Sequence, residues 1–322
     1  MLDGLIYAFL FDGDGGAKEL QAEEIEGWAP DQGLLWLHFD YSKAEAQHWI
    51  TEKSDLDPIA VSALLAEETR PRASVAGKTL LMALRGVNMN PGADPEDMVS
   101  IRLWSDGKRI ISSRRRRLLS VDDIISKIRN GTGPTTAAEF IALLAAQLTA
   151  RMHDAIDELE DQVAELEEQV LTESRQAMRA ELSDMRRELI ALRRYIAPQR
   201  EALNRIQLDA PSWFDDMQKL RMRETADRLT LYIEVLDSVR ERAGVAQEEL
   251  NNQISEEANR RMYVLSIVAA IFLPLGFFTG LLGINVGGMP GADNGWAFWF
   301  VCGICVAVVV WEVLLFRRKQ WL

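Results

Sequence analysis

Few residues of this 322-residue chain have types and spacing that could do chemistry, and the most unusual lie in one glycine-rich segment. The segment GLLGINVGGMPGADNGW holds four glycines, one proline and one asparagine between Gly283 and Gly291. Glycine lets the backbone approach a neighbour or an ion closely, and Asn285 offers an amide oxygen and an amide donor. Repeated around an axis, such groups can hold a hydrated cation through its water without trapping it.

Two acids near this segment, Asp293 and Glu312, are candidates for cation attraction or proton coupling. Asp293 could attract cations electrostatically, or it could be a solvated loop acid. Glu312 is the one ionisable residue within a long apolar run, and acids inside a membrane are candidate functional groups. The same side chain could instead reach toward Arg317 or water.

The remaining metal-binding residue types do not form a dedicated site in the sequence. Cys302 and Cys305 share one helix face, so they could form a metal-binding or redox pair. The simpler interpretation is that they are small residues of a packed membrane helix. His38, His48 and His153 are far apart in sequence, and we expect each to be structural rather than a ligand. No cofactor is expected, and the position of any bound metal stays unassigned.

Two apolar runs flank the glycine-rich segment and position it. Residues 262–282 carry no charge and residues 296–316 carry only Glu312, and about 20 apolar residues span a bilayer as a helix. Arginine and lysine flank the outer ends of both runs, whereas the connecting loop 283–295 has neither. The positive-inside rule therefore predicts a multi-pass protein with both termini in the cytoplasm, including the basic tail 317–322.

Residues 1–145 predict a cytoplasmic domain of mixed α and β structure. Strands are expected at 34–41 and 78–89, a helix at 57–68, and a hairpin around Asp106-Gly107. Arg114 to Arg117 predict a basic surface facing an acidic helix, since a net charge of -13 argues against nucleic acid as a partner.

Residues 146–261 predict a helical stalk. Two heptad seams indicate two long helices that turn back on each other, one acidic and one rich in arginine, so that opposite charges pair. An acidic face that concentrates cations near a pore is the alternative. After Pro211, a third helix of about 60 residues, roughly 90 Å, is expected to run into the first apolar run. The seams are Met152, Ile156, Leu159, Val163, Leu166, Val170, and Met178, Leu182, Met185, Leu189, Leu192, Ile196.

The motif GINVGGMPG, preceded by FLPLGFFTG, resembles the signature of the CorA family of divalent metal ion transporters. That family ends its first membrane helix in Gly-Met-Asn, whereas Ile284 stands at the middle position here, which resembles the ZntB branch of zinc transporters. The stretches LRRYIAPQREAL, NRRMYVLSI and RRKQWL resemble further parts of the family, so the resemblance covers nearly the whole chain.

The resemblance implies a funnel-shaped homopentamer in a bacterial inner membrane, with an α+β cytoplasmic domain, long stalk helices and two transmembrane helices. It implies an entrance filter at Gly283, Ile284 and Asn285, and a polar residue at the cytoplasmic end of the pore, Asn259. Between them one helix face would line the pore, although helix-on-helix packing would explain the same stripe. That face is Met262, Leu265, Ala269, Leu273, Gly276 and Gly280.

The prediction that follows is a transporter of divalent cations, with Zn²⁺ uptake coupled to protons as the first choice. A passive Mg²⁺ or Co²⁺ channel, zinc efflux, and a membrane-anchored sensor or scaffold are the alternatives. The sequence contains no Walker loop, nucleophile motif or metal-ligand cluster, so an enzyme is not expected. Expected partners are further copies of the chain, the bilayer, divalent cations and protons.

Overall fold

The computed structural model describes residues 2–172, 176–284, 291 and 294–319, and its core is built around the apolar strand β3 (Leu35–Asp40). Successive side chains of a strand point to opposite faces. Leu35, Leu37 and Phe39 therefore lie on one face, and Trp36 and His38 lie on the other. All five are at most 1% exposed, which explains why the strand is apolar on both faces apart from His38 and the terminal Asp40.

The sheet has seven strands in the order β2-β1-β3-β7-β6-β5-β4. Only the pairing of β3 with β7 is parallel. The predicted strands and the predicted hairpin are confirmed. The other strands are β1 (Leu5–Phe11), β2 (Ala17–Glu19), β4 (Arg72–Ala76), β5 (Thr79–Gly86), β6 (Val99–Ser105) and β7 (Arg109–Arg114).

The β6–β7 turn has a specific local cause. The Asp106 carboxylate accepts hydrogen bonds from the backbone N–H groups of Lys108 (2.9 Å) and Arg109 (2.7 Å). Gly107 has φ +90°, and a Cβ there would lie 2.5 Å from the ring of Trp213. Only glycine meets both requirements without strain.

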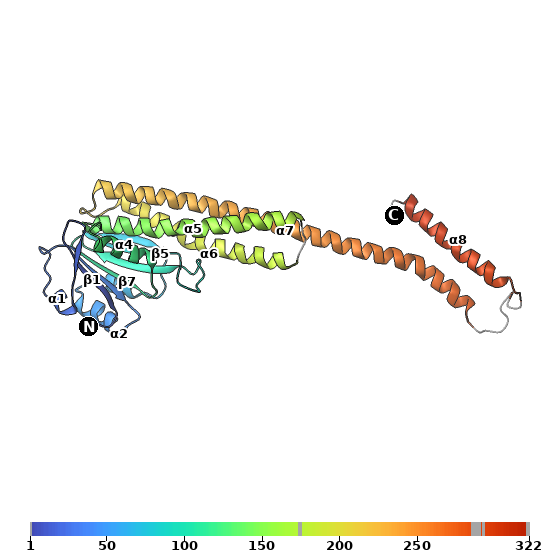
Figure 1. Cartoon of the computed structure of the whole chain (residues 1–322), viewed down its shortest axis with the longest axis horizontal. Coiled ribbons are helices and arrows are strands. Elements are labelled where there is room, and N and C mark those ends of the chain that lie inside the picture. The colour runs from blue at the N-terminus through green and yellow to red at the C-terminus, as the bar shows by residue number, and fades with distance from the viewer. Residues whose placement is uncertain (1, 173–175, 285–290, 292–293, 320–322) are drawn as a thin grey trace. The chain divides into compact units, whose positions relative to one another are not determined.

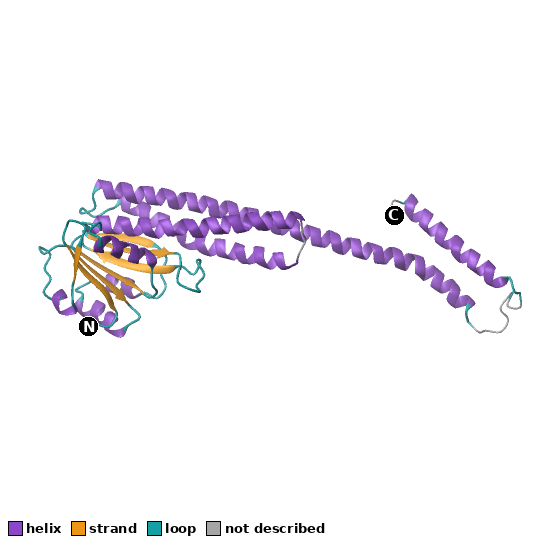
Figure 2. Ribbon diagram, viewed as in Figure 1, coloured by secondary structure: helices purple, strands orange, loops and turns teal. Residues whose placement is uncertain are grey.

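Helices cover both faces of this sheet (Figure 2). On the Leu35 face lie α1 (Ala22–Ile25), α2 (Ala44–His48), the π-helical segment η1 (Trp49–Lys53) and α3 (Pro58–Leu65). On the Trp36 face, α5 (Ala137–Thr172) brings Phe140 within 4.6 Å of the Trp36 ring, centroid to centroid. There α6 (Gln176–Leu208) packs on β4 and β5, and α4 (Leu119–Arg129) packs on α5.

The first part of α7 (Asp216–Leu282) runs beside α5 and α6 (Figure 1). Both predicted heptad seams are buried, except that Met185 is only half-buried. The sequence predicted charge pairing between the acidic and the arginine-rich helix, and the structure shows ion pairs between each of these helices and α7. The Arg242 guanidinium pairs with Glu167 of α5 at 2.5 Å, and Arg193 of α6 pairs with Asp237 of α7 at 2.6 Å.

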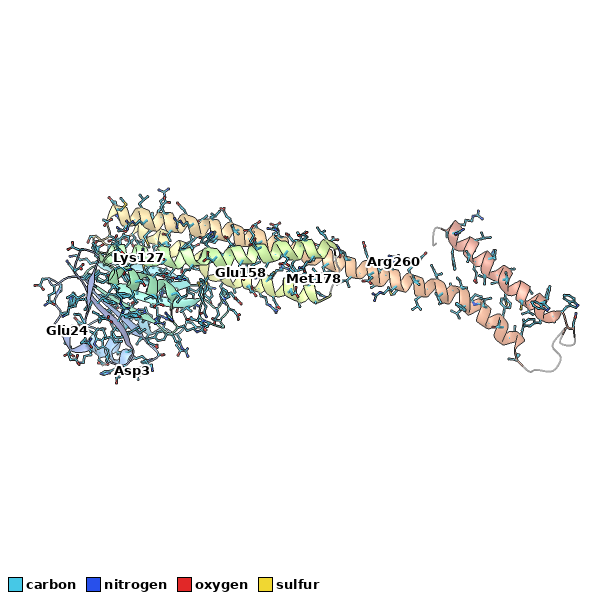
Figure 3. All side chains as sticks on the ribbon, viewed as in Figure 1. Asp3, Glu24, Lys127, Glu158, Met178 and Arg260 are labelled. Carbon is cyan, nitrogen blue, oxygen red and sulfur yellow. The ribbon has the colours of Figure 1, made fainter. Side chains whose placement is uncertain are left out.

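The chain forms two compact units, Met1–Glu248 and Glu249–Leu322. The second unit is a helical hairpin of the C-terminal part of α7 and α8 (Ala297–Arg318). Two helices, α7 and α8, are long and apolar enough to cross a membrane, and almost none of either apolar stretch is buried. Around Arg260 the side chains of α7 project on all sides (Figure 3), so this segment lacks the cover that a soluble core helix has. The domain boundaries predicted from the sequence stay predictions.

Candidate functional site

The predicted entrance filter begins where α7 ends. After Leu282, the N–H of Gly283 bonds to the Gly280 carbonyl at 3.2 Å. A Cβ at Gly283 would lie 2.9 Å from the Thr279 carbonyl oxygen, so a larger residue would force this turn to shift. Ile284 follows with 49% of its surface exposed. Asn285 and Asp293 lie outside the described residues.

The predicted pore-lining residues all lie on exposed surface of α7. In the hairpin, α7 is half-buried at a different set of positions, which includes Ile267, Ala270, Ile271 and Pro274. The predicted face therefore lies on the side of α7 opposite the covered face, where it stays free for contacts outside the chain. The exposed set is Asn259, Met262, Leu265, Ala269, Leu273, Gly276 and Gly280.

This face offers an ion no strong ligand. Its members inside the apolar run are apolar or glycine. Two hydroxyl groups on the same part of α7 are held by their own helix: Ser266 donates to the Met262 carbonyl at 2.8 Å, and Thr279 donates to the Leu275 carbonyl at 2.8 Å. An ion passing along such a surface would keep its hydration shell, and the path could close by dewetting.

Glu312 is buried in the hairpin, whereas one interpretation of the sequence expected it to reach toward Arg317 or water. Its side chain is only 8% exposed, and its Oε2 atom is buried without a hydrogen-bond partner. The neighbouring Trp311 and Leu314 are 63% and 60% exposed. Helix geometry thus turns Glu312 toward α7, while its neighbours face outward.

No group of three or more His, Cys, Asp or Glu side chains that could hold a metal ion occurs among the described residues. Cys302 and Cys305 are free and half-buried. His153 stacks on Tyr232, with a centroid separation of 6.0 Å. The donor set therefore offers no site that would bind zinc tightly in the described chain.

In the N-terminal unit, His38 lies in a buried hydrogen-bonded group. The sequence did not indicate the residues that surround it. Its Nε2 accepts a hydrogen bond from Arg114 Nε at 3.0 Å, so its Nδ1 carries the proton and donates to Ser112 Oγ at 2.8 Å. Ser112 Oγ also accepts from Trp36 Nε1 at 2.8 Å. Burial, assisted by the charge of Arg114, lowers the pKa of His38 to about 3.

The four-arginine run does not form the predicted basic surface facing an acidic helix. Arg114 turns inward to His38, and Arg116 pairs with Asp97 in the loop before β6. Only Arg117 pairs with an acid of a helix, Asp122 of α4, at 2.8 Å. The reason is that β7 continues through Arg114, so strand alternation places this side chain on the Trp36 face.

Several carboxylates lie close together beside α5 and α6. This arrangement is consistent with the alternative prediction of an acidic face that concentrates cations. Glu96, Glu158 and Glu188 line a cavity of about 110 Å³. Burial raises the pKa of Glu188, and the charges of Glu96 and Asp94 raise it further. This group attracts cations without the geometry of a metal site.

Similarity to known proteins extends over the whole chain. The "Divalent cation transporter CmaX" of Pseudomonas aeruginosa is 41% identical over 99% of this chain and 97% of its own length. The "Zinc transport protein ZntB" of Pectobacterium atrosepticum is 34% identical over 99% of this chain and 96% of its own length.

The fold is similar to that of a solved structure as well. The structure of full-length CmaX matches 99% of this chain and 98% of that chain, with 40% identity and a TM-score of 0.85. It confirms the predicted fold of an α/β domain with a long helix and two candidate membrane helices. The family described as "CorA-like Mg2+ transporter protein" matches residues 31–318. The chain belongs to this CorA family, as the glycine-rich motif and the helices around it predicted.

Proposed function

We propose that this protein transports a divalent cation across a bacterial inner membrane, with Zn²⁺ as the first candidate and a proton gradient as the driving force. The observation that carries the proposal is similarity over 99% of the chain to proteins named as a divalent cation transporter and as a zinc transport protein. Ile284 in the motif favours zinc, because the zinc branch that the motif resembles departs from methionine at this position.

The path would lie on the axis of a homopentamer, because two spans in one chain cannot enclose a polar path. Five copies of α7 would present the exposed stripe from Asn259 to Gly280 to the axis. Gly283, Ile284 and Asn285 would form the outer mouth, where Asp293 attracts cations. A hydrated ion fits a face without charged or strongly ligating groups. Both termini and the whole N-terminal unit would lie in the cytoplasm.

The test is zinc flux into liposomes that hold the purified full-length protein, with and without an acidic outside. Faster zinc entry on imposing the gradient supports a proton-coupled zinc transporter. Flux that is indifferent to pH and is outcompeted by Mg²⁺ would replace it with a passive magnesium channel, the candidate that the family's description favours. Absence of any ion flux would favour an anchored sensor or scaffold.

The mouth can be tested in the same assay. Asn285→Ala should abolish selective flux while the oligomer stays assembled, because the neutral polar ring is lost. The matched control is Asn204→Ala on the exposed side of α6, where the amide bonds only to Gln207 at 3.2 Å. Normal zinc flux in Asn285→Ala would show that Asn285 does not form the outer mouth. The proposal that the protein transports zinc would be unaffected.

A further inference from the structure

Glu312 is a buried acid, and the hairpin leaves one of its two carboxylate oxygens without a partner. It lies on α8, away from the stripe proposed to line the path. Its Oε2 atom is buried and receives no hydrogen bond. A buried ionised carboxylate is strongly unfavourable unless it is paired, whereas a protonated carboxyl needs only one acceptor for its O–H group.

A cavity lies between α8 and α7, one helical turn along α8 from this acid. It has a volume of about 280 Å³ and is lined by Phe316, one helical turn after Glu312, and by four residues of α7. These four residues, spaced along one face of α7, are Tyr263, Ser266, Ile267 and Ala270. No charged side chain lines the cavity, so nothing in its wall stabilises an ionised Glu312.

Proline frees one backbone carbonyl on the half-buried face of α7. Pro274 lies inside the helix and has no N–H, so the carbonyl of Ala270 loses its helical hydrogen bond. Ala270 and Pro274 are both half-buried, and Ala270 lines the cavity. Carbonyls freed by proline in membrane helices are commonly satisfied by groups on neighbouring helices.

We propose that Glu312 is the proton-binding group of the transport cycle, and that its protonation closes α8 onto α7 at the carbonyl freed by Pro274. The inference rests on the proposed function. Water supplies the proton to the carboxylate, the O–H donates to the Ala270 carbonyl, and release of the proton removes that donor. The ionised side chain then has to be hydrated, which separates the two helices beside the residue where α7 can bend.

Few other groups compete for this proton. On α7, Tyr263 is the titratable residue that lines the cavity, and Arg260 and Arg261 precede it. On α8, Cys305 lies two turns before Glu312 on the same face. Arg317, Arg318 and Lys319 follow at the end of the chain, where they would draw the ionised carboxylate toward water.

The experiment compares Glu312→Gln with Glu312→Asp in proteoliposomes at fixed internal pH and varied external pH, following zinc entry and internal acidification together. Glutamine resembles the protonated form of Glu312 and cannot release a proton. We therefore expect that external acid no longer accelerates zinc entry in Glu312→Gln, and that zinc entry no longer acidifies the interior of the liposomes. Aspartate keeps an ionisable carboxyl group and should retain acceleration by external acid. The control, Glu256→Gln on the exposed surface of α7, should behave as the unchanged protein does.

A second measurement does not depend on flux. The infrared band of protonated carboxyl groups at acidic pH should lose one component in Glu312→Gln, because the other acids of the chain contribute equally in both proteins. If external acid accelerates zinc entry in Glu312→Gln as much as in the unchanged protein, the role of Glu312 is overturned. An unaltered infrared band in Glu312→Gln would overturn it as well. Neither result would touch the proposed proton coupling itself. Zinc flux in the unchanged protein that ignores external pH would instead overturn the proposed proton coupling, and Glu312's role would fall with it.

Discussion

His38 should make the stability of the N-terminal unit depend on pH in a way that can be calculated. Its pKa is lowered from an ordinary value of 6.5 to about 3, chiefly by burial. The unfolded chain therefore binds a proton below about pH 6.5 while the folded protein does not. The stabilisation is complete above pH 6.5 and is lost progressively as the pH falls toward about 3. At about 1.4 kcal/mol per pH unit, His38 alone removes about 2 kcal/mol between pH 7 and pH 5.

The assay is urea unfolding of the full-length protein in detergent at pH 7 and pH 5, followed by tryptophan fluorescence. His38→Gln will lower stability at both pH values, because Ser112 and Arg114 lose a hydrogen-bond partner. The prediction concerns the difference between the two pH values, which should shrink by about 2 kcal/mol. His48→Gln, on an exposed histidine, is the matched control and should keep the full difference. An equal difference in His38→Gln and the unchanged protein would refute the reasoning.

Three further outcomes follow from contacts of named residues. Phe140→Ala should lower the free energy of unfolding by about 3–5 kcal/mol, measured in the same urea assay, because a side chain 1% exposed leaves a cavity under Trp36. Arg242→Ala should lower it by no more than about 1 kcal/mol, because its pair with Glu167 is partly solvent-exposed. Leu273→Trp should reduce zinc flux several-fold by narrowing the proposed path, whereas Leu281→Trp, outside the predicted face, should leave it near normal.

Periodicity in the sequence predicted the elements whose signal is local. The strand at 34–41, the turn at Asp106-Gly107 and the seam from Met152 to Val170 all follow from patterns a few residues long, and the structure confirms them. A third long helix was expected as well, and α7 has 67 residues.

What the sequence did not reveal depends on contacts between distant residues. Trp36, His38 and Ser112 form one hydrogen-bonded group only because β3 pairs with β7 in register. A signal was available, since Ser112 and Arg114 are two residues apart in one strand and must share a face. Without the partner strand, the pattern does not say which side chain they meet. The burial of Glu312 was also hidden, because hydropathy does not distinguish the two faces of an apolar helix.

The parallel pairing of β3 with β7 also sets an order of events during synthesis. Trp36 and Ser112 are separated by 76 residues, which a ribosome takes about 4 to 15 s to add. During that interval one edge of β3 has no strand to pair with, and an unpaired apolar edge can join another chain. In the β4–β7 meander, by contrast, each strand pairs with the next one along the chain, so none of them waits as long for its partner. Within the N-terminal unit, the first 40 residues should therefore be the part of the nascent chain that most needs a chaperone.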